Sequence, residues 1–130
     1  TKVSHKEFDK RFKQVTGAKR TLNFYGMVEQ VGGIFMENQN GNLNASIYSD
    51  IIIRDPHTLK ALPIGQPGLV QVLSILPESY PGHSILTEDI GVLLGEDSGD
   101  MGGRYFKIEG RAPNSELRGC SDTFSENLKK

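Results

Sequence analysis

Apolar and polar residues follow two different patterns along this chain. In the first twenty residues the apolar positions recur at the spacing of one helix face, at Phe8, Phe12 and Val15. Ser4, followed three residues later by Glu7, is typical of a capping box, and Gly17 is a typical helix end. The pattern predicts a helix over about residues 4–17, which we expect to be an ordinary packing helix.

From residue 21 to about residue 118 the apolar runs are short and are separated by Gly, Pro and Asn. The runs that predict strands are residues 22–25, 33–37, 46–54, 69–76, 84–94 and 105–110. Residues 38–42 carry a hairpin signal, and residues 95–103 predict an exposed loop. Residues 84–94 fit one strand or two, and residues 105–110 alternate like an edge strand.

These signals predict an α+β, β-rich fold, with one N-terminal helix followed by a small distorted antiparallel β-barrel or sandwich. We expect residues 1–120 to form a single domain and residues 121–130 to form a flexible C-terminal tail.

Composition narrows the function classes. The 130 residues carry a formal net charge of -1, so no basic excess points to nucleic acid, and no apolar run is long enough to span a membrane. The single cysteine excludes an internal disulfide and favours a reducing, cytoplasmic setting. Because residue 1 is Thr and not Met, we expect the chain to be a piece of a longer protein.

That one cysteine, Cys120, is a candidate nucleophile. Thiolates attack acyl carbons, the guanidinium of Arg118 favours the thiolate, and Gly119 permits close approach to a ligand. The alternative is that Cys120 is a small buried hydrophobe without chemistry.

Three further segments carry functional signal. In the first, the Tyr25 ring is suited to stacking on a purine, Gly26 allows close approach, and Glu29 is suited to holding Mg²⁺ near phosphates. In the second, Asp89 is suited to accepting hydrogen bonds from both ribose hydroxyls. In the third, Arg111 is suited to pairing with a phosphate. The alternatives are an ordinary strand end, a turn acid and a surface arginine.

Taken in order, the segments resemble the motifs of adenylate-forming enzymes, a group that includes acyl-CoA synthetases and phenylacetate-CoA ligases. The closer resemblance is to the acyl-protein synthetases, the family of the fatty-acid-activating LuxE-like component of bacterial bioluminescence. It rests on residues 25–30 (Tyr-Gly-Met-Val-Glu-Gln), 53–56 (Ile-Arg-Asp-Pro), 80–89, 110–111 and 117–122. The resemblance implies the C-terminal part of the large domain of an adenylate-forming enzyme.

The resemblance also implies roles in a ligase that uses ATP and Mg²⁺. Tyr25 would stack on adenine with Gly26 beside it, Glu29 would place Mg²⁺ and the phosphates, and Asp89 would hold the ribose. Arg111 would contact ribose or phosphate. Cys120, assisted by Arg118, would accept the acyl group as a thioester. Implied partners are a fatty acid substrate, the upstream part of the enzyme, and the acyl-CoA-reductase-like and acyltransferase subunits of a fatty acid reductase complex.

The chain departs from the wider pattern at several motif positions, namely Val28, Leu86, Glu88, Ala112 and Pro113. It also lacks the Ser/Thr/Gly-rich phosphate loop that precedes the Tyr-Gly motif in such enzymes, so we expect residues 1–130 alone to be inactive. Two alternatives stay open: a fragment of a phenylacetate-CoA-like acyl-CoA ligase, and a non-catalytic β-rich binding module.

Overall fold

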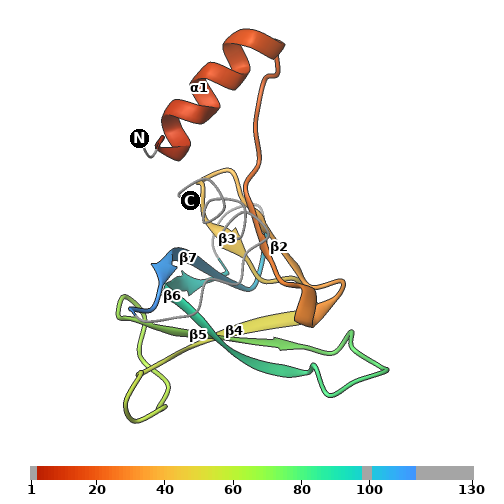
Figure 1. Cartoon of the computed structure of the whole chain (residues 1–130), viewed down its shortest axis with the longest axis vertical. Coiled ribbons are helices and arrows are strands. Elements are labelled where there is room, and N and C mark those ends of the chain that lie inside the picture. The colour runs from red at the N-terminus through yellow and green to blue at the C-terminus, as the bar shows by residue number, and fades with distance from the viewer. Residues whose placement is uncertain (1–2, 98–100, 114–130) are drawn as a thin grey trace, which may run out of the picture.

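The computed structural model describes residues 3–97 and 101–113, which form one helix and a seven-stranded antiparallel sheet (Figure 1). The elements are α1 (His5–Thr16), β1 (Phe24–Gly26), the 3-10 turn η1 (Val28–Gln30), β2 (Ile34–Glu37), β3 (Leu43–Asn44), β4 (Ser49–Arg54), β5 (Pro67–Ser74), β6 (Ser84–Glu96) and β7 (Arg104–Arg111). The predicted β-rich α+β fold with an N-terminal helix is confirmed. The domain limits stay a prediction, because the expected tail at residues 121–130 lies outside the described residues.

Helix α1 has the predicted ends. The Ser4 side chain accepts a hydrogen bond from the Glu7 backbone N–H at 3.2 Å, and Gly17 ends the helix with a φ of 72°. The apolar face, however, is exposed, with Val15 at 87% exposure. Figure 1 shows α1 standing apart from the sheet. Within the described residues α1 is therefore not the packing helix that its periodicity predicts.

The sheet has the strand order β1-β2-β3-β7-β6-β5-β4 and curves around one core. That core joins Phe35 of β2, near one edge of the sheet, to Ile51 and Ile53 of β4 at the other edge. Because β7 pairs with β3 on one side and β6 on the other, the prediction of an edge strand at residues 105–110 was wrong. An alternating pattern of apolar and polar residues indicates that one face of a strand is buried. It does not indicate whether the strand has one neighbouring strand or two.

Strand β6 also differs from its prediction. It is one strand of 13 residues, and it includes Gly95 and Glu96, which the glycine-rich composition assigned to a loop. A Cβ atom at Gly95 would lie 2.4 Å from the hydroxyl of Tyr105, which is its partner on β7. The glycine is there to make room for a tyrosine on the neighbouring strand, and it does not mark a turn.

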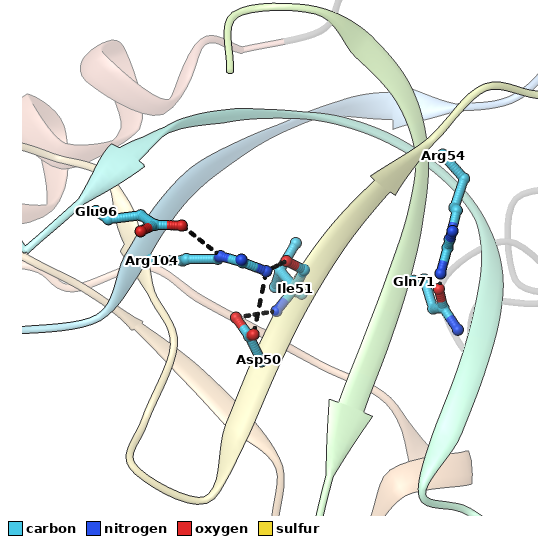
Figure 2. Close-up of polar contacts among 6 residues, drawn as sticks. All are labelled: Asp50, Ile51, Arg54, Gln71, Glu96 and Arg104. Atoms are coloured by element: carbon cyan, nitrogen blue, oxygen red, sulfur yellow. Dashed lines mark hydrogen bonds and ion pairs between the residues drawn. The ribbon is translucent and has the colours of Figure 1, made fainter. Parts of the chain in front are cut away.

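Arg104 ties the curved sheet together across strands that are not neighbours (Figure 2). From β7, its Nε lies 2.8 Å from Glu96 on β6, and its Nη1 donates to Asp50 Oδ2 at 3.1 Å and to the Ile51 carbonyl oxygen at 3.0 Å, both on β4. On the adjoining part of the sheet, Arg54 Nε donates to Gln71 Oε1 at 2.7 Å (Figure 2). The Arg104 fork thus holds the edge strand β4 close to β7.

Candidate functional site

An open cleft of about 950 Å³ lies between the turn that follows β1 and the first half of β6. The residues that line it are Phe24, Gly26, Met27, Val28, Glu29, Gln30, Val31, Gly32, Gly33, Ile34, Ile85, Leu86, Thr87, Glu88, Asp89 and Arg111. Four of the five nucleotide-site residues expected from the sequence are in this set. Segments that are more than 50 residues apart in the chain therefore meet at one cleft.

One wall of the cleft is built by the end of β1 and by η1. Gly26 pairs with Ile34 of β2, which brings the chain back on itself around η1. This turn leaves Glu29 exposed on the cleft side, while the next residue, Gln30, is buried with 1% of its surface exposed. The carboxylate of Glu29 has no hydrogen bond or ion pair with another described residue.

The other wall is built by β6 and the end of β7. The register places Asp89 opposite Arg111, and opposed residues of an antiparallel pair project to the same face. Arg111 Nε lies 3.8 Å from Asp89 Oδ1, and Thr87 Oγ1 accepts a hydrogen bond from the Asp89 backbone N–H at 3.1 Å. Strand pairing thus sets both the carboxylate and the guanidinium at the cleft.

Tyr25 joins the two walls. Its hydroxyl donates a hydrogen bond to Asp89 Oδ2 at 2.7 Å. Burial of the phenol raises the pKa of Tyr25 well above its usual value, and the hydrogen bond to Asp89 and the negative charge of that carboxylate raise it further. The hydroxyl is therefore a neutral donor at physiological pH.

The Tyr25 ring lies against the core and not among the cleft-lining side chains. Its centroid is 6.0 Å from that of Phe35 and 6.2 Å from that of Phe106. The alternation of β1 explains this position, because Phe24 and Gly26 face the cleft and the residue between them faces the other way. The stacking of adenine on Tyr25 stays a prediction.

Glu88 is a cleft residue that sequence reasoning treated only as a departure from a motif. Its Oε2 accepts a hydrogen bond from Arg111 Nη2 at 3.1 Å, and its backbone oxygen accepts one from the Ala112 N–H at 2.7 Å. Arg111 is therefore placed between two carboxylates, those of Glu88 and Asp89. The signal for this pairing was the acidic dipeptide on β6, whose partner on β7 is known only once the register is known.

The charges at the cleft bear on its fit to Mg²⁺. Three lining residues are acidic and one, Arg111, is basic, so the described walls do not offset the charge of a polyphosphate. In residues 3–97 and 101–113 no group of three or more His, Cys, Asp or Glu side chains is arranged to hold a metal ion. One accessible carboxylate, that of Glu29, fits the mode in which Mg²⁺ is held by one or two carboxylates and by substrate phosphates.

Two expected residues, Arg118 and Cys120, lie outside the described residues. Their roles stay predictions. In the part of the chain that the structure does describe, no helix is long and apolar enough to cross a membrane.

Comparison with known proteins adds three findings. A family model described as "Acyl-protein synthetase, LuxE" matches residues 1–129. The long-chain-fatty-acid–luciferin-component ligase of Vibrio harveyi is 38% identical over 72 residues, which are 55% of this chain and 18% of the ligase. The ATP-bound crystal structure of MatB from Rhodopseudomonas palustris matches 79% of this chain and 22% of its own, with a TM-score of 0.54 and 23% identity.

The structure of MatB without ligand gives the same result, with a TM-score of 0.55. At 23% identity, both structures establish a shared fold. The chain spans less than a quarter of the length of the relatives it matches.

Proposed function

This chain belongs to the acyl-protein synthetase (LuxE) family, and we propose that the enzyme it forms part of activates a fatty acid with ATP and then transfers the acyl group to Cys120. The observation that carries the proposal is the meeting of Gly26, Glu29, Asp89 and Arg111 at one cleft. The curated relative in Vibrio harveyi is a ligase for long-chain fatty acids, which supports the substrate class.

The described walls would bind the ribose of the nucleotide and one side of its phosphate chain. Asp89 presents a carboxylate already oriented by Tyr25, and such a carboxylate accepts hydrogen bonds from ribose hydroxyls. The planar fork of Arg111 would exchange part of its contact with Glu88 for a phosphate oxygen or the ribose. Gly26 leaves room beside the β1 strand end for the ligand to approach.

In the first step a fatty acid carboxylate oxygen attacks the α-phosphorus of ATP. A bond forms between that carboxylate oxygen and the α-phosphorus. The bond from the α-phosphorus to the oxygen that bridges it to the β-phosphorus breaks, and pyrophosphate leaves. Glu29 would hold Mg²⁺, which when bound offsets charge on the phosphates. The chain's own contribution is to position the ribose through Asp89 and the phosphate edge through Arg111.

In the second step the Cys120 thiolate attacks the acyl carbonyl carbon. A carbon–sulfur bond forms, the acyl–oxygen bond breaks, AMP leaves, and the thiol proton passes to solvent. Arg118, two residues away in the sequence, would favour the thiolate. A thioester on the chain would then meet the next enzyme at high local concentration.

The partners follow from this chemistry. A protein-bound thioester is a suitable substrate for an acyl-CoA-reductase-like subunit, and an acyltransferase subunit would supply the fatty acid, as in a fatty acid reductase complex. Thioester formation on Cys120 needs a reduced thiol, which supports a cytoplasmic setting for the proposed enzyme.

Residues 1–130 alone would not adenylate. The described cleft offers one cation against three carboxylates, so the remainder of the enzyme must supply most groups that bind the triphosphate. Fatty-acid-dependent exchange of pyrophosphate into ATP by this chain alone would contradict that expectation.

The test of the adenylation step is the same exchange assay on the intact enzyme. We expect exchange to depend on a fatty acid and to fall at least about tenfold in Glu29→Gln at limiting Mg²⁺, because the metal loses its protein carboxylate. The control is Glu109→Gln, an exposed acid of β7 that does not line the cleft. An intact enzyme without exchange, or equal loss in both variants, would overturn the assignment.

A further inference from the structure

We propose that Gln30 is a positioning residue for Glu29: its buried amide clamps the turn that carries Glu29 onto the loop at residues 80–83. This inference deepens the proposed function and rests on the metal role given there to Glu29. The adenylation chemistry assigns no role to the Tyr-Pro-Gly-His segment at residues 80–83, although it is part of the sequence motif.

Two hydrogen bonds form the clamp. Gln30 Nε2 donates to the Gly82 carbonyl oxygen at 2.9 Å, and the Val31 N–H donates to the Tyr80 hydroxyl at 3.2 Å. They join segments that are about 50 residues apart in the chain, directly beside the cleft. Glu29 directly precedes Gln30 and lies two residues before Val31, so the clamp restrains the backbone that carries Glu29.

Glycines on the two sides make room for the two side chains of the clamp, Gln30 and Tyr80. A Cβ atom at Gly33 would lie 3.1 Å from Gln30 Oε1, and one at Gly82 would lie 2.2 Å from the ring of Tyr80. The Tyr80 ring therefore lies against Gly82, whose carbonyl oxygen accepts the hydrogen bond from Gln30. The two glycines explain why the Gly-Gly pair after η1 and the Tyr-Pro-Gly turn fit together.

The Gln30 amide is only half satisfied, which argues that it does more than stabilise the fold. Gln30 Oε1 is buried and meets no donor among the described residues. A buried acceptor without a partner is costly, and an apolar side chain of the same shape would avoid that cost. An amide is thus a poorer choice than an apolar side chain for stability alone. Its hydrogen bond to Gly82, however, fixes the orientation of the turn.

The fixed turn matters because the affinity for a metal held by a single carboxylate depends on the orientation of that carboxylate. Groups that orient metal ligands without touching the metal typically change affinity by about 10–100-fold when they are removed. Glu29 itself is exposed and has no described partner, so the backbone on either side of it is what limits its direction.

The test compares Gln30→Met with Asn44→Leu in the intact enzyme. Asn44 is the matched control because it is a buried amide, 1% exposed, that lies on β3 and does not line the cleft. Each substitution replaces a buried amide by an apolar side chain of similar size. The first measurement is hydrogen–deuterium exchange without nucleotide. We expect faster exchange at residues 28–33 in Gln30→Met only.

The second measurement is Mg²⁺ dependence, read both as MgATP binding by calorimetry and as pyrophosphate exchange. We expect Gln30→Met to raise the half-saturating Mg²⁺ concentration about tenfold while the rate at saturating Mg²⁺ changes less than about twofold. Unchanged exchange at residues 28–33 would overturn the clamp, and faster exchange with unaltered Mg²⁺ dependence would overturn the positioning role. A wild-type enzyme without adenylation would instead overturn the proposed function, and the hydrogen-exchange result would still decide on the clamp.

Discussion

The hydrogen bond from Tyr25 to Asp89 offers a sharp test of how the cleft is built. Replacing Tyr25 by Phe removes the hydroxyl and keeps the ring against Phe35 and Phe106. If the tyrosine served only as a core aromatic, the substitution would be silent. If its hydroxyl orients Asp89, both stability and the shape of the ribose site depend on it.

The magnitude follows from the burial of the pair. A hydrogen bond to a charged group contributes about 1.5–3 kcal/mol. The Asp89 side chain is 24% exposed, so water replaces part of the lost contact and we expect the lower end, about 1.5 kcal/mol. For a domain of this size that corresponds to a fall in Tm of about 6 °C.

The assay is thermal and urea unfolding of the chain, with Tyr105→Phe as the matched control. Tyr105 is half-buried, and its hydroxyl has no hydrogen bond within the described residues. A double-mutant cycle with Asp89→Ala, which removes the acceptor, isolates the pair, and we expect a coupling energy of about 1 kcal/mol. Equal effects of Tyr25→Phe and Tyr105→Phe, or a coupling energy near zero, would refute the reasoning.

Two further predictions concern stability. Arg104→Lys keeps the charge and loses the fork that bonds Glu96, Asp50 and the Ile51 carbonyl, so we expect a loss of about 1–2 kcal/mol by urea unfolding. Arg11→Lys, at an exposed helix pair, should cost less than about 0.5 kcal/mol, and equal costs would contradict the role of Arg104. The pKa of Asp55 lies below its ordinary value because its carboxylate accepts hydrogen bonds from the backbone N–H groups of Thr58 and His57 and from the Thr58 hydroxyl. A lowered folded-state pKa adds stability above the unfolded-state pKa of about 3.9, and this is lost as pH falls through the folded-state value. The urea midpoints of wild type and Asp55→Ala should thus differ by a constant amount above pH ~5 and converge below pH ~4, and a gap that widens in acid would refute the assignment.

Local signals predicted most of the secondary structure, because caps and turns act within a few residues. Ser4 and Gly17 bound the helix as expected, and the clearest strand signal, at residues 69–76, corresponds to β5 at Pro67–Ser74. Pairing across the sheet was not predictable in the same way. The central position of β7 and the inclusion of Gly95 in β6 depend on which strand lies alongside, and that information is not local.

The candidate site also combines features that local sequence predicts with features that depend on how distant segments pair. The family resemblance is confirmed, and the short motifs predicted Gly26, Glu29, Asp89 and Arg111, which the fold brings to one cleft. The ion pair of Glu88 with Arg111 follows from the strand register, and the contact of Gln30 with Gly82 follows from two loops meeting. Neither has a signature in its own segment.

The orientation of Tyr25 was also beyond local reasoning. A three-residue strand gives too few positions to decide which face is buried, and the decision comes from Phe35 and Phe106 on other strands. The exposed apolar face of α1 is a related case. Its periodicity predicts a partner surface, and the described sheet does not supply it.

The central claim is that a fatty acid is activated with ATP and transferred to Cys120. Its most direct test is intact and peptide mass spectrometry of the full enzyme after incubation with ATP, Mg²⁺ and a long-chain fatty acid. We predict one acyl group on the peptide that contains Cys120, dependent on ATP and removed by neutral hydroxylamine. The same thioester persisting in a Cys120→Ser variant, or no acylation of an enzyme that does catalyse pyrophosphate exchange, would contradict the account.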